Sequence, residues 1–565
     1  MADLHTTNLC VQIVSTHFGP LASKIASTLL SHGRLTLPQL VRFTAFKPRL
    51  VRNILLILIQ QNIIWHANSE TDGSGEEVLE INADECLMRL RFGAFVYQAE
   101  ELFGVAGGEI VQLVLHHGKL TSPQILQRLN AAATTTSFLP GKDKTPVVYS
   151  QALHKLVLLH YLKPSVVSSH ISPRDKRIQY EAEEKAKISG FPTSKQLREA
   201  KETVDARLRT DEEEVWKIGL NRKAKSQLPS TKKRKVTSTK EEDDMITVYF
   251  RVNFDKFIIH TRNALIVKAV KERYNSGAAL VVHAILKITE ESQHSVADCR
   301  SDPLSVSNIT LHLSSEEDEE TLTSGLIQSS SRTMSSGSCI KEYLGILSSA
   351  DNPTPAGRAG AFLELSSKGG GSGKVQMLFD VVARRLRRQV LEGVARERHG
   401  SEGVRVVRLL MDTGKLDEKQ ISKHVMMPLK DVRPLLSALS ASSLVSIVEV
   451  PKSADRNPTR MFYLWQVDIP KAFSYILNVL YKTLYNISAR RQAEREDPML
   501  IAVLNKRERS DVSVDVEGLL SQHEKEVLKA WEEKQEKLGI LEGRVEESVF
   551  IVRDLGRAVG SLEEN

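Results

Sequence analysis

The chain has 565 residues and a formal net charge of +7, with 41% hydrophobic and 26% charged residues. This length exceeds what one hydrophobic core organises, so we expect several domains. The composition is typical of a folded soluble protein, and the mild positive charge permits contact with nucleic acid without requiring it. No apolar run reaches the roughly 18 residues of a membrane span, and the first ten residues lack the pattern of a signal peptide. We therefore expect no contact with a membrane and no secretion.

The residue types that usually form metal sites and active sites are scattered along the chain. The four cysteines, Cys10, Cys86, Cys299 and Cys339, form no CxxC pair, which argues against a zinc ribbon or a disulfide scaffold and for reduced thiols. The carboxylate clusters at 241–244 and 316–320 lie in predicted linkers, whereas a two-metal active site needs carboxylates on a rigid scaffold. We expect no active site, no cofactor, no metal and no small-molecule substrate.

The N-terminal part of the chain contains a repeat. The segment FGPLASKIASTLLSHGRLTLPQL at 18–40 returns as FGVAGGEIVQLVLHHGKLTSPQI at 103–125. A third version, GVRVVRLLMDTGKLDEKQI, begins at Gly403. Because repeats determine architecture, the chain is predicted to contain the same small domain several times.

The repeated unit has a recognisable order of elements. In the first copy a helix over 18–32 is predicted to end at Gly33, because glycine adopts a left-handed conformation without a Cβ penalty. Thr36 is a natural N-cap for the second helix, and Thr121 and Asp417 take its place in the other copies. A longer helix from Lys47 follows, and then two β-rich runs around a glycine-containing loop. Three helices and a hairpin predict a winged helix.

We predict a mainly α fold with small β-wings (α+β): four tandem winged helices and a C-terminal coiled-coil hairpin. An acidic and serine-rich insertion at 290–338 is predicted to be disordered. Two amphipathic helices packed on the last winged helix are the alternative for the C-terminal part. The predicted domains are winged helix 1 at 1–95, winged helix 2 at 96–180, a charged linker at 181–244, winged helix 3 at 245–374, winged helix 4 with a preceding basic helix at 375–468, and the hairpin at 469–565.

The charged linker contains the cluster KKRKV. Its residues Lys232, Lys233, Arg234 and Lys235 form a compact basic group of the kind that nuclear-import receptors bind. The alternative is a solvated linker that is merely basic. Both interpretations stay open from the sequence.

Candidate DNA contacts follow from the way a winged helix binds. Its third helix usually enters the major groove, so basic residues on these helices are candidates. The candidate residues are Lys47, Arg49 and Arg52 in the first copy, Lys430 and Arg433 in the last, and Arg384, Arg385, Arg387 and Arg388 in the basic helix. None of these helices has the set of side chains expected for reading bases. We expect sequence-independent contacts with the DNA backbone or with single strands.

Two observations favour protein partners instead. The third helix of the first copy continues as ILLILIQQNIIW, which is apolar almost all round and indicates burial or a protein partner. The arginines of the basic helix suit phosphates and carboxylates equally. We infer that most of the winged helices bind protein surfaces.

The assembled motifs support a family resemblance. They are the N-terminal pair of repeats, the segment VNFDKFIIHTRNALIVKAVKERYNSGAALVVHAILK, the segment from GKVQMLFDVV to LLMDTGKL, and MFYLWQVD followed by a helical tail. The chain resembles, over nearly its whole length, the third-largest subunit of eukaryotic RNA polymerase III in its fungal form, a family related to the α subunit of TFIIE. The resemblance implies four extended winged helices and a C-terminal coiled coil.

The resemblance also implies a function. It predicts a nuclear, non-catalytic subunit that forms an initiation subcomplex with two companion subunits, contacts the polymerase clamp, and supports promoter-directed initiation and DNA opening at genes for tRNA and 5S rRNA. The main alternative is a free-standing winged-helix transcription regulator, which would carry base-reading side chains and bind duplex tightly alone. A scaffold of the proteasome-lid type would instead need a helical-repeat array before one winged helix.

Overall fold

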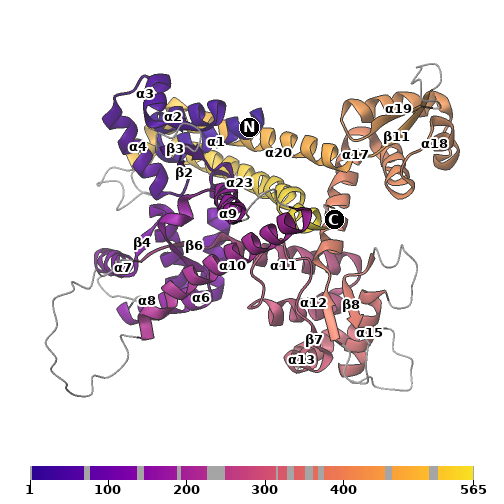
Figure 1. Ribbon diagram of the computed structural model, residues 1–565, viewed down its shortest axis with the longest axis horizontal. Helices are drawn as coiled ribbons and strands as arrows, with labels where there is room; N and C mark the ends of the chain where they lie inside the picture. The colour runs from indigo at the N-terminus through magenta and orange to yellow at the C-terminus, as the bar shows by residue number, and fades with distance from the viewer. Residues whose placement is uncertain are drawn as a thin grey trace. The chain divides into compact units, whose positions relative to one another are not determined.

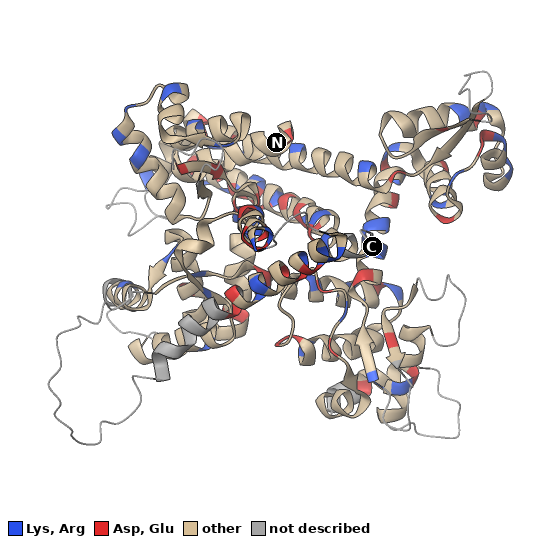
Figure 2. Cartoon of the chain, viewed as in Figure 1, with Lys and Arg blue, Asp and Glu red and all other residues tan. Residues whose placement is uncertain are grey.

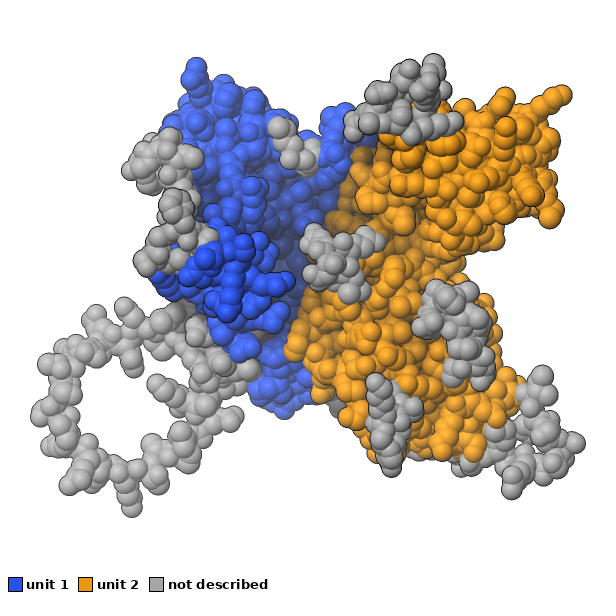
Figure 3. Space-filling model, turned by 45° about the vertical axis from the view of Figure 1, so that its right-hand side comes forward, with its two compact units in different colours: residues 1–257 blue, residues 258–565 orange. Residues whose placement is uncertain are grey.

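The computed structural model is mainly helical with small antiparallel sheets, which confirms the predicted fold class (Figure 1). Two compact units, residues 1–257 and 258–565, make up the chain (Figure 3). No helix among the described residues is long and apolar enough to cross a membrane. The described residues are 3–68, 77–136, 145–187, 193–224, 248–313, 316–326, 336–349, 360–366, 374–451, 461–507 and 520–563.

The first winged helix opens unit 1. Gly19 (φ 86°) separates its first two helices and Gly33 (φ 83°) ends the second, and this backbone conformation favours glycine. As predicted, Thr36 caps the next helix in a capping box with Gln39. The sheet has the order β1-β3-β2. The elements are α1 (Leu4–Phe18), α2 (Pro20–His32), β1 (Leu35–Thr36), α3 (Leu37–Thr44), α4 (Pro48–Gln60), β2 (Ile64–Asn68) and β3 (Glu77–Ile81).

The second winged helix repeats the order of elements of the first, except that its last strand comes from much later in the chain. Gly104 (φ 75°) and Gly118 (φ 78°) take the places of Gly19 and Gly33. The backbone N–H of Thr121 donates to Gln124, as that of Thr36 does to Gln39. Its elements are α5 (Ala83–Met88), η1 (Arg89–Arg91), α6 (Phe92–His117), β4 (Leu120–Thr121), α7 (Ser122–Thr136), α8 (Pro146–Leu158), β5 (Leu162–Ser165), η2 (Val167–His170), α9 (Pro173–Ala186), α10 (Ser194–Ala224) and β6 (Tyr249–Val252).

The last strand of this second sheet comes from a distant part of the chain. The strand order is β4-β6-β5, and Leu162 pairs with Val252. The prediction that residues from 245 onward start the third winged helix is therefore corrected, because β6 completes the second. The range 181–244 is likewise more than a linker, because it contains the end of α9 and all of α10, and α10 packs against α9. Two ion pairs join these helices, Arg177 to Asp205 at 2.6 Å and Arg207 to Glu183 at 2.6 Å.

A polar seam joins the two winged helices of unit 1. The Gln60 side chain donates to the carbonyl oxygens of His117 at 3.2 Å and Lys119 at 2.7 Å. The buried ammonium of Lys119 donates to the Ile59 carbonyl at 3.2 Å and contacts His170. Burial lowers the pKa of Lys119 to about 8. Burial, together with the charge of Lys119, lowers the pKa of His170 to about 4.

Unit 2 contains the third winged helix, whose sheet order is β7-β9-β8. Helix α11 precedes α12, and it begins a few residues before position 258, where unit 2 starts. The predicted disorder of 290–338 is wrong for the described residues there, because they supply a strand and two helices. The elements are α11 (Phe254–Arg273), α12 (Ser276–Thr289), β7 (Leu304–Ser305), α13 (Val306–His312), α14 (Glu316–Ser324), α15 (Ser336–Ser348), β8 (Leu363–Ser366) and β9 (Lys374–Met377).

The inserted helix α14 is held by the core of the third winged helix. Leu322 on α14 is fully buried, and the Tyr343 hydroxyl donates to its carbonyl at 3.0 Å. The amide of Asn275 donates to the Gly325 carbonyl at 3.0 Å. A Cβ at Gly325 would lie 2.4 Å from the Tyr343 hydroxyl, so this close packing requires glycine. The acidic sequence of α14 contains few apolar residues, so it gives little indication of this packing.

The fourth winged helix and the C-terminal helices complete unit 2. Gly400 (φ 71°) kinks α17 and Gly414 (φ 84°) ends it. The predicted helical hairpin is present as α20 and α23, which pair through Arg491–Glu542 at 2.6 Å and Lys534–Glu494 at 2.9 Å. The elements are α17 (Phe379–Thr413), α18 (Glu418–Val425), α19 (Leu429–Ala441), β10 (Ser446–Pro451), β11 (Met461–Gln466), α20 (Ile469–Arg495), α21 (Pro498–Arg507), α23 (Gln522–Val549), η4 (Phe550–Asp554) and α24 (Gly556–Glu563).

Candidate nucleic-acid interface

The helix-turn-helix of the fourth winged helix is the best-formed candidate. Asp417 caps α18 in a capping box with Gln420, as predicted. Apolar side chains of α18 and α19 lie in the hydrophobic core, with Val432, Leu436 and Leu439 fully buried. Because these residues occupy the inner stripe, the opposite stripe of each helix faces solvent.

Three lysines lie on this solvent side. Lys419 and Lys423 are exposed one turn apart on α18, and Lys430 is exposed in the first turn of α19. An anion near the first turn of a helix interacts favourably with its free N–H groups, so this is a suitable place for a phosphate. Arg433 is also exposed but pairs with Glu418 at 3.0 Å. We name Lys419, Lys423 and Lys430 the α18–α19 lysines.

Only part of this set is predicted from the sequence. Lys430 and Arg433 are predicted because they lie on the third helix, whereas Lys419 and Lys423 on the second helix are missed. Their spacing of four residues, which places both on one helical face, is the signal that identifies them.

The first winged helix carries a second group of exposed cations. Lys47 precedes α4 as its N-cap residue, and Arg49 and Arg52 lie in its first two turns. All three predicted residues are exposed. Blue segments mark the Lys and Arg residues along α3 and α4 (Figure 2). These cations are therefore placed where an anionic partner can reach them.

The basic helix at the start of α17 uses its arginines within unit 2. The four predicted residues differ in their partners but all have one. Arg384 pairs with Asp380 at 2.5 Å, Arg385 donates to the Gly360 carbonyl at 3.1 Å, Arg387 lies 4.1 Å from the ring centre of Phe473, and Arg388 pairs with Asp412 at 2.7 Å. These contacts favour a structural role, and their contact with nucleic acid stays a prediction.

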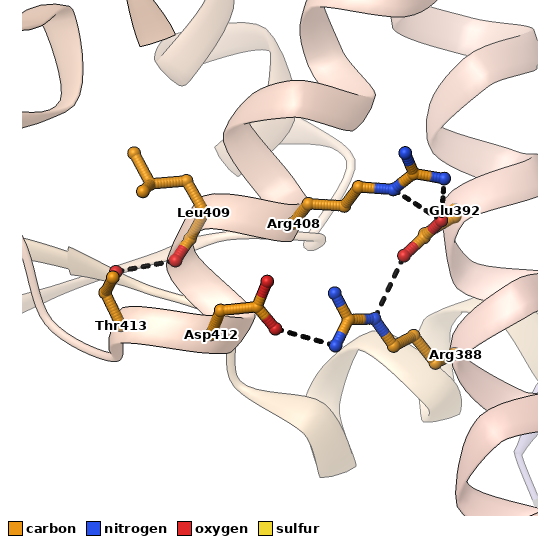
Figure 4. Close-up of polar contacts among 6 residues, drawn as sticks. All are labelled: Arg388, Glu392, Arg408, Leu409, Asp412 and Thr413. Atoms are coloured by element: carbon orange, nitrogen blue, oxygen red, sulfur yellow. Dashed lines mark hydrogen bonds and ion pairs between the residues drawn. The ribbon is translucent and has the colours of Figure 1, made fainter. Parts of the chain in front are cut away.

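Arg388 belongs to an ion-pair network that braces the kink of α17 (Figure 4). Glu392 accepts hydrogen bonds from Arg388 at 3.0 Å and from Arg408 at 2.7 and 2.5 Å. Burial alone would raise the pKa of Glu392, but the hydrogen bonds from Arg408 and Arg388 lower it overall. The network joins the two arms of α17 on either side of Gly400. Arg388 therefore helps to orient the first helix of the fourth winged helix.

The remaining predicted residues cannot be placed. The import candidates Lys232, Lys233, Arg234 and Lys235 lie outside the described residues. Within the described part of the chain, no group of three or more His, Cys, Asp or Glu side chains is arranged to hold a metal ion.

Four winged helices, two of them with exposed cations on their helix-turn-helix, followed by a helical hairpin, define a tandem winged-helix protein. A family model for the RNA polymerase III subunit RPC82 helix-turn-helix domain matches residues 8–68. The model for RNA polymerase III subunit RPC82 matches 151–353, and the model for the POLR3C C-terminal winged-helix domain matches 391–467. The chain belongs to the family of the third-largest subunit of RNA polymerase III.

Full-length relatives agree with this assignment. The DNA-directed RNA polymerase III subunit RPC3 of Rattus norvegicus is 26% identical over 569 residues, covering 96% of this chain and 97% of the relative. The protein of that name from Homo sapiens is 25% identical over 571 residues, with the same coverage. The Aspergillus niger subunit rpc3 is 26% identical over 642 residues, covering 98% and 100%. The similarity therefore includes both units.

Proposed function

We propose that the chain is a nuclear, non-catalytic subunit of DNA-directed RNA polymerase III. It acts in a three-subunit initiation subcomplex that supports promoter-directed initiation and DNA opening at genes for small untranslated RNAs such as tRNA and 5S rRNA. Its protein partners are other polymerase subunits, including two companions in the subcomplex and the clamp. The observation that carries the proposal is the similarity of the chain, over nearly its whole length, to relatives named RNA polymerase III subunit RPC3.

The exposed side chains support DNA contacts that ignore sequence. The α18–α19 lysines offer point charges to phosphates, whereas base reading needs bidentate donors such as Arg, Asn or Gln aimed into the groove. The solvent-facing middle of α19 carries Ser437 and Ala438, which are too short for such readout. A protein that binds DNA in this way gains specificity from the complex that holds it. The free-standing regulator is disfavoured on these grounds.

The test is purification of the tagged full chain from nuclear extract after nuclease treatment and a high-salt wash, with mass spectrometry of the eluate. The proposal predicts that the two largest subunits of RNA polymerase III return in near-equal amounts with the chain. Return of the chain alone, or its loss together with the digested DNA, would contradict the proposal and favour the free regulator.

A second measurement separates the DNA contact from assembly. Binding of the purified chain to duplexes of unrelated sequence should be weak, salt-sensitive and nearly independent of sequence. A preference of a thousandfold or more for one sequence would instead indicate a specific regulator.

A further inference from the structure

The third helices of the first and fourth winged helices match position by position. Both α4 and α19 have 13 residues. The buried residues Val51, Leu55 and Leu58 of α4 correspond to Val432, Leu436 and Leu439 of α19. The exposed cations also correspond, with Arg49 and Arg52 at the positions of Lys430 and Arg433. The two helices therefore present the same positions to solvent.

The two helices differ in the middle of this exposed stripe. On α4 the stripe carries Leu56 and Ile57, which are 65% and 51% exposed. On α19 the same positions are Ser437 and Ala438, both exposed. Burying a leucine and an isoleucine is favourable and leaving them in water is not, so the fold of a winged helix does not account for them.

The second winged helix shows that the exposed positions vary freely. On α8 the position of Arg49 is Val147, and the positions of Leu56 and Ile57 are His154 and Lys155. The buried positions stay apolar, as Tyr149, Leu153 and Leu156. The combination of cations at one end and aliphatic side chains in the middle is thus particular to α4 among these three helices.

The cations and aliphatic side chains of α4 form one surface. Residues 49 and 56 lie two helical turns apart on the same side, and Arg52 precedes Leu56 by four residues. We name Lys47, Arg49, Arg52, Leu56 and Ile57 the α4 face. It combines a positive end with an apolar centre on a rigid helix.

The stretch of sequence that contains the α4 face has no acidic residue of its own. Residues 4–69 contain six Lys and Arg residues and no Asp or Glu. Outside that stretch, Glu80 on β3 and Asp175 on α9 pair with Arg34, at 2.8 Å each. Phe43 on the neighbouring helix α3 adds a 48% exposed ring. Charge complementarity therefore calls for an acidic partner that also brings apolar side chains.

DNA fits the α4 face less well than protein does. Phosphates would pair with the cations, but Leu56 and Ile57 would then be held against a polar, strongly hydrated groove without a donor to offer it. An amphipathic helix that lays its apolar side on these residues and its carboxylates on the cations satisfies both halves of the surface.

We propose that the α4 face binds an amphipathic, acidic segment of another polypeptide, with aliphatic or aromatic side chains against Leu56 and Ile57 and carboxylates against Lys47, Arg49 and Arg52. This deepens the proposed function, on which it rests, because it assigns one surface of the scaffold to a class of partner. The fourth winged helix, with its small Ser437 and Ala438, keeps the DNA-facing role.

The test places a photoreactive p-benzoylphenylalanine at position 56 of the tagged full chain. The complex purified after nuclease treatment is irradiated, and the crosslinked peptide is sequenced by mass spectrometry. The expected peptide belongs to another chain, is rich in Asp and Glu, and contains aliphatic or aromatic residues at helical spacing. The double variant R49E/R52E should lower the crosslink yield at least tenfold.

Matched controls use the corresponding positions of α19. The variant K430E should leave the crosslink from position 56 unchanged, and the same photoreactive residue at position 437 should not capture the acidic peptide. Circular dichroism of each variant checks that the chain stays folded, which is expected because the altered residues are exposed.

The other outcomes overturn the inference. They are a crosslink to nucleic acid in the undigested complex, a crosslink to a segment without acidic residues, a yield unaffected by R49E/R52E, or no crosslink. The two largest polymerase subunits are measured in the same eluate. Their absence contradicts the proposed function, whereas their presence beside any of these outcomes contradicts only the inference about the α4 face.

Discussion

The first and fourth winged helices share one plan and expose different chemistry. Ala45 and Met426 end the second helix of each in the left-handed conformation, with φ of 56° and 58°. Yet α4 exposes Leu56 and Ile57 where α19 exposes Ser437 and Ala438. The comparison teaches that the inward stripe of each helix specifies the domain, whereas the outward stripe specifies what the domain binds.

The largest expected effect comes from removing the proposed DNA contact of the fourth winged helix. We expect the triple variant K419E/K423E/K430E to weaken nonspecific duplex binding by about ten- to a hundredfold at low salt, because three attractive phosphate interactions become repulsive. The slope of log K against log salt should fall by about 3, since each phosphate neutralised by a lysine contributes near 0.9. Fluorescence anisotropy at several salt concentrations measures both quantities.

The control for that experiment is the double variant L56S/I57A, which gives α4 the surface of α19. It should leave duplex binding unchanged. Equal reductions of duplex affinity in the two variants would contradict the contrast between α4 and α19, because both helices would then bind the same ligand.

The next largest effect is expected from removing the Glu392 carboxylate, which joins the two arms of α17 at its kink. We expect E392Q to weaken the packing of the two arms by about 2 kcal/mol, because the charge-assisted hydrogen bonds of Arg388 and Arg408 lose their carboxylate. Amide hydrogen exchange over 403–413 should rise by roughly 30-fold, since each 1.4 kcal/mol is about a factor of ten. The first winged helix has no acidic residue around Gly19, so exchange in α2 should not change.

The exposed Glu397 on the same arm of α17 provides the matched control. E397Q should leave exchange over 403–413 as it is in the native chain. A similar increase in both variants would mean that the network contributes nothing beyond general charge.

Acid should destabilise unit 1 through His170. The folded-state pKa is lowered to about 4 from an ordinary 6.5, with burial as the main cause and Lys119, Arg251, His66 and Lys176 adding to it. Between these two values the unfolded chain binds a proton that the folded chain does not, so stability falls as the pH drops from 6.5 to 4. We expect H170N to flatten this dependence in thermal unfolding of unit 1. An unchanged slope would show that another group is responsible.

The smallest expected effect concerns the left-handed residue that ends the second helix of the first and of the fourth winged helix. We expect A45G and M426G each to stabilise the chain by about 0.5–1 kcal/mol, because a residue with a Cβ is strained at positive φ. Differential scanning calorimetry should show two similar upward shifts in melting temperature. A shift at only one site would show that the two turns differ in more than their exposed side chains.

Local signals make much of the fold predictable. Gly33 is a predicted helix end, Gly118 and Gly414 occupy its place in the other two copies of the repeat, and all three have positive φ in the structure. The predicted N-caps Thr36 and Asp417 both form capping boxes at the start of their helices. Such signals depend on residues within one turn of each other, so a sequence contains them in full.

Contacts between distant residues leave no such local signal. One of the two carboxylate partners of Arg388 is Asp412, 24 residues away, and Arg385 donates to the carbonyl of Gly360. A run of arginines therefore resembles a DNA-binding helix when part of its partners lie far away in the sequence. The strand β6 is predicted in the wrong domain for the same reason, because only tertiary pairing identifies its sheet.

The position of β6 has a consequence for synthesis. Ser165 on β5 pairs with Tyr249 on β6, so more than 80 residues leave the ribosome between the two strands. During that interval β5 presents an unpaired edge, and closing so long a loop is slow compared with pairing neighbouring strands. The second sheet therefore matures after the first, and a nascent chain halted before residue 249 is predicted to hold a finished first winged helix beside an incomplete second one.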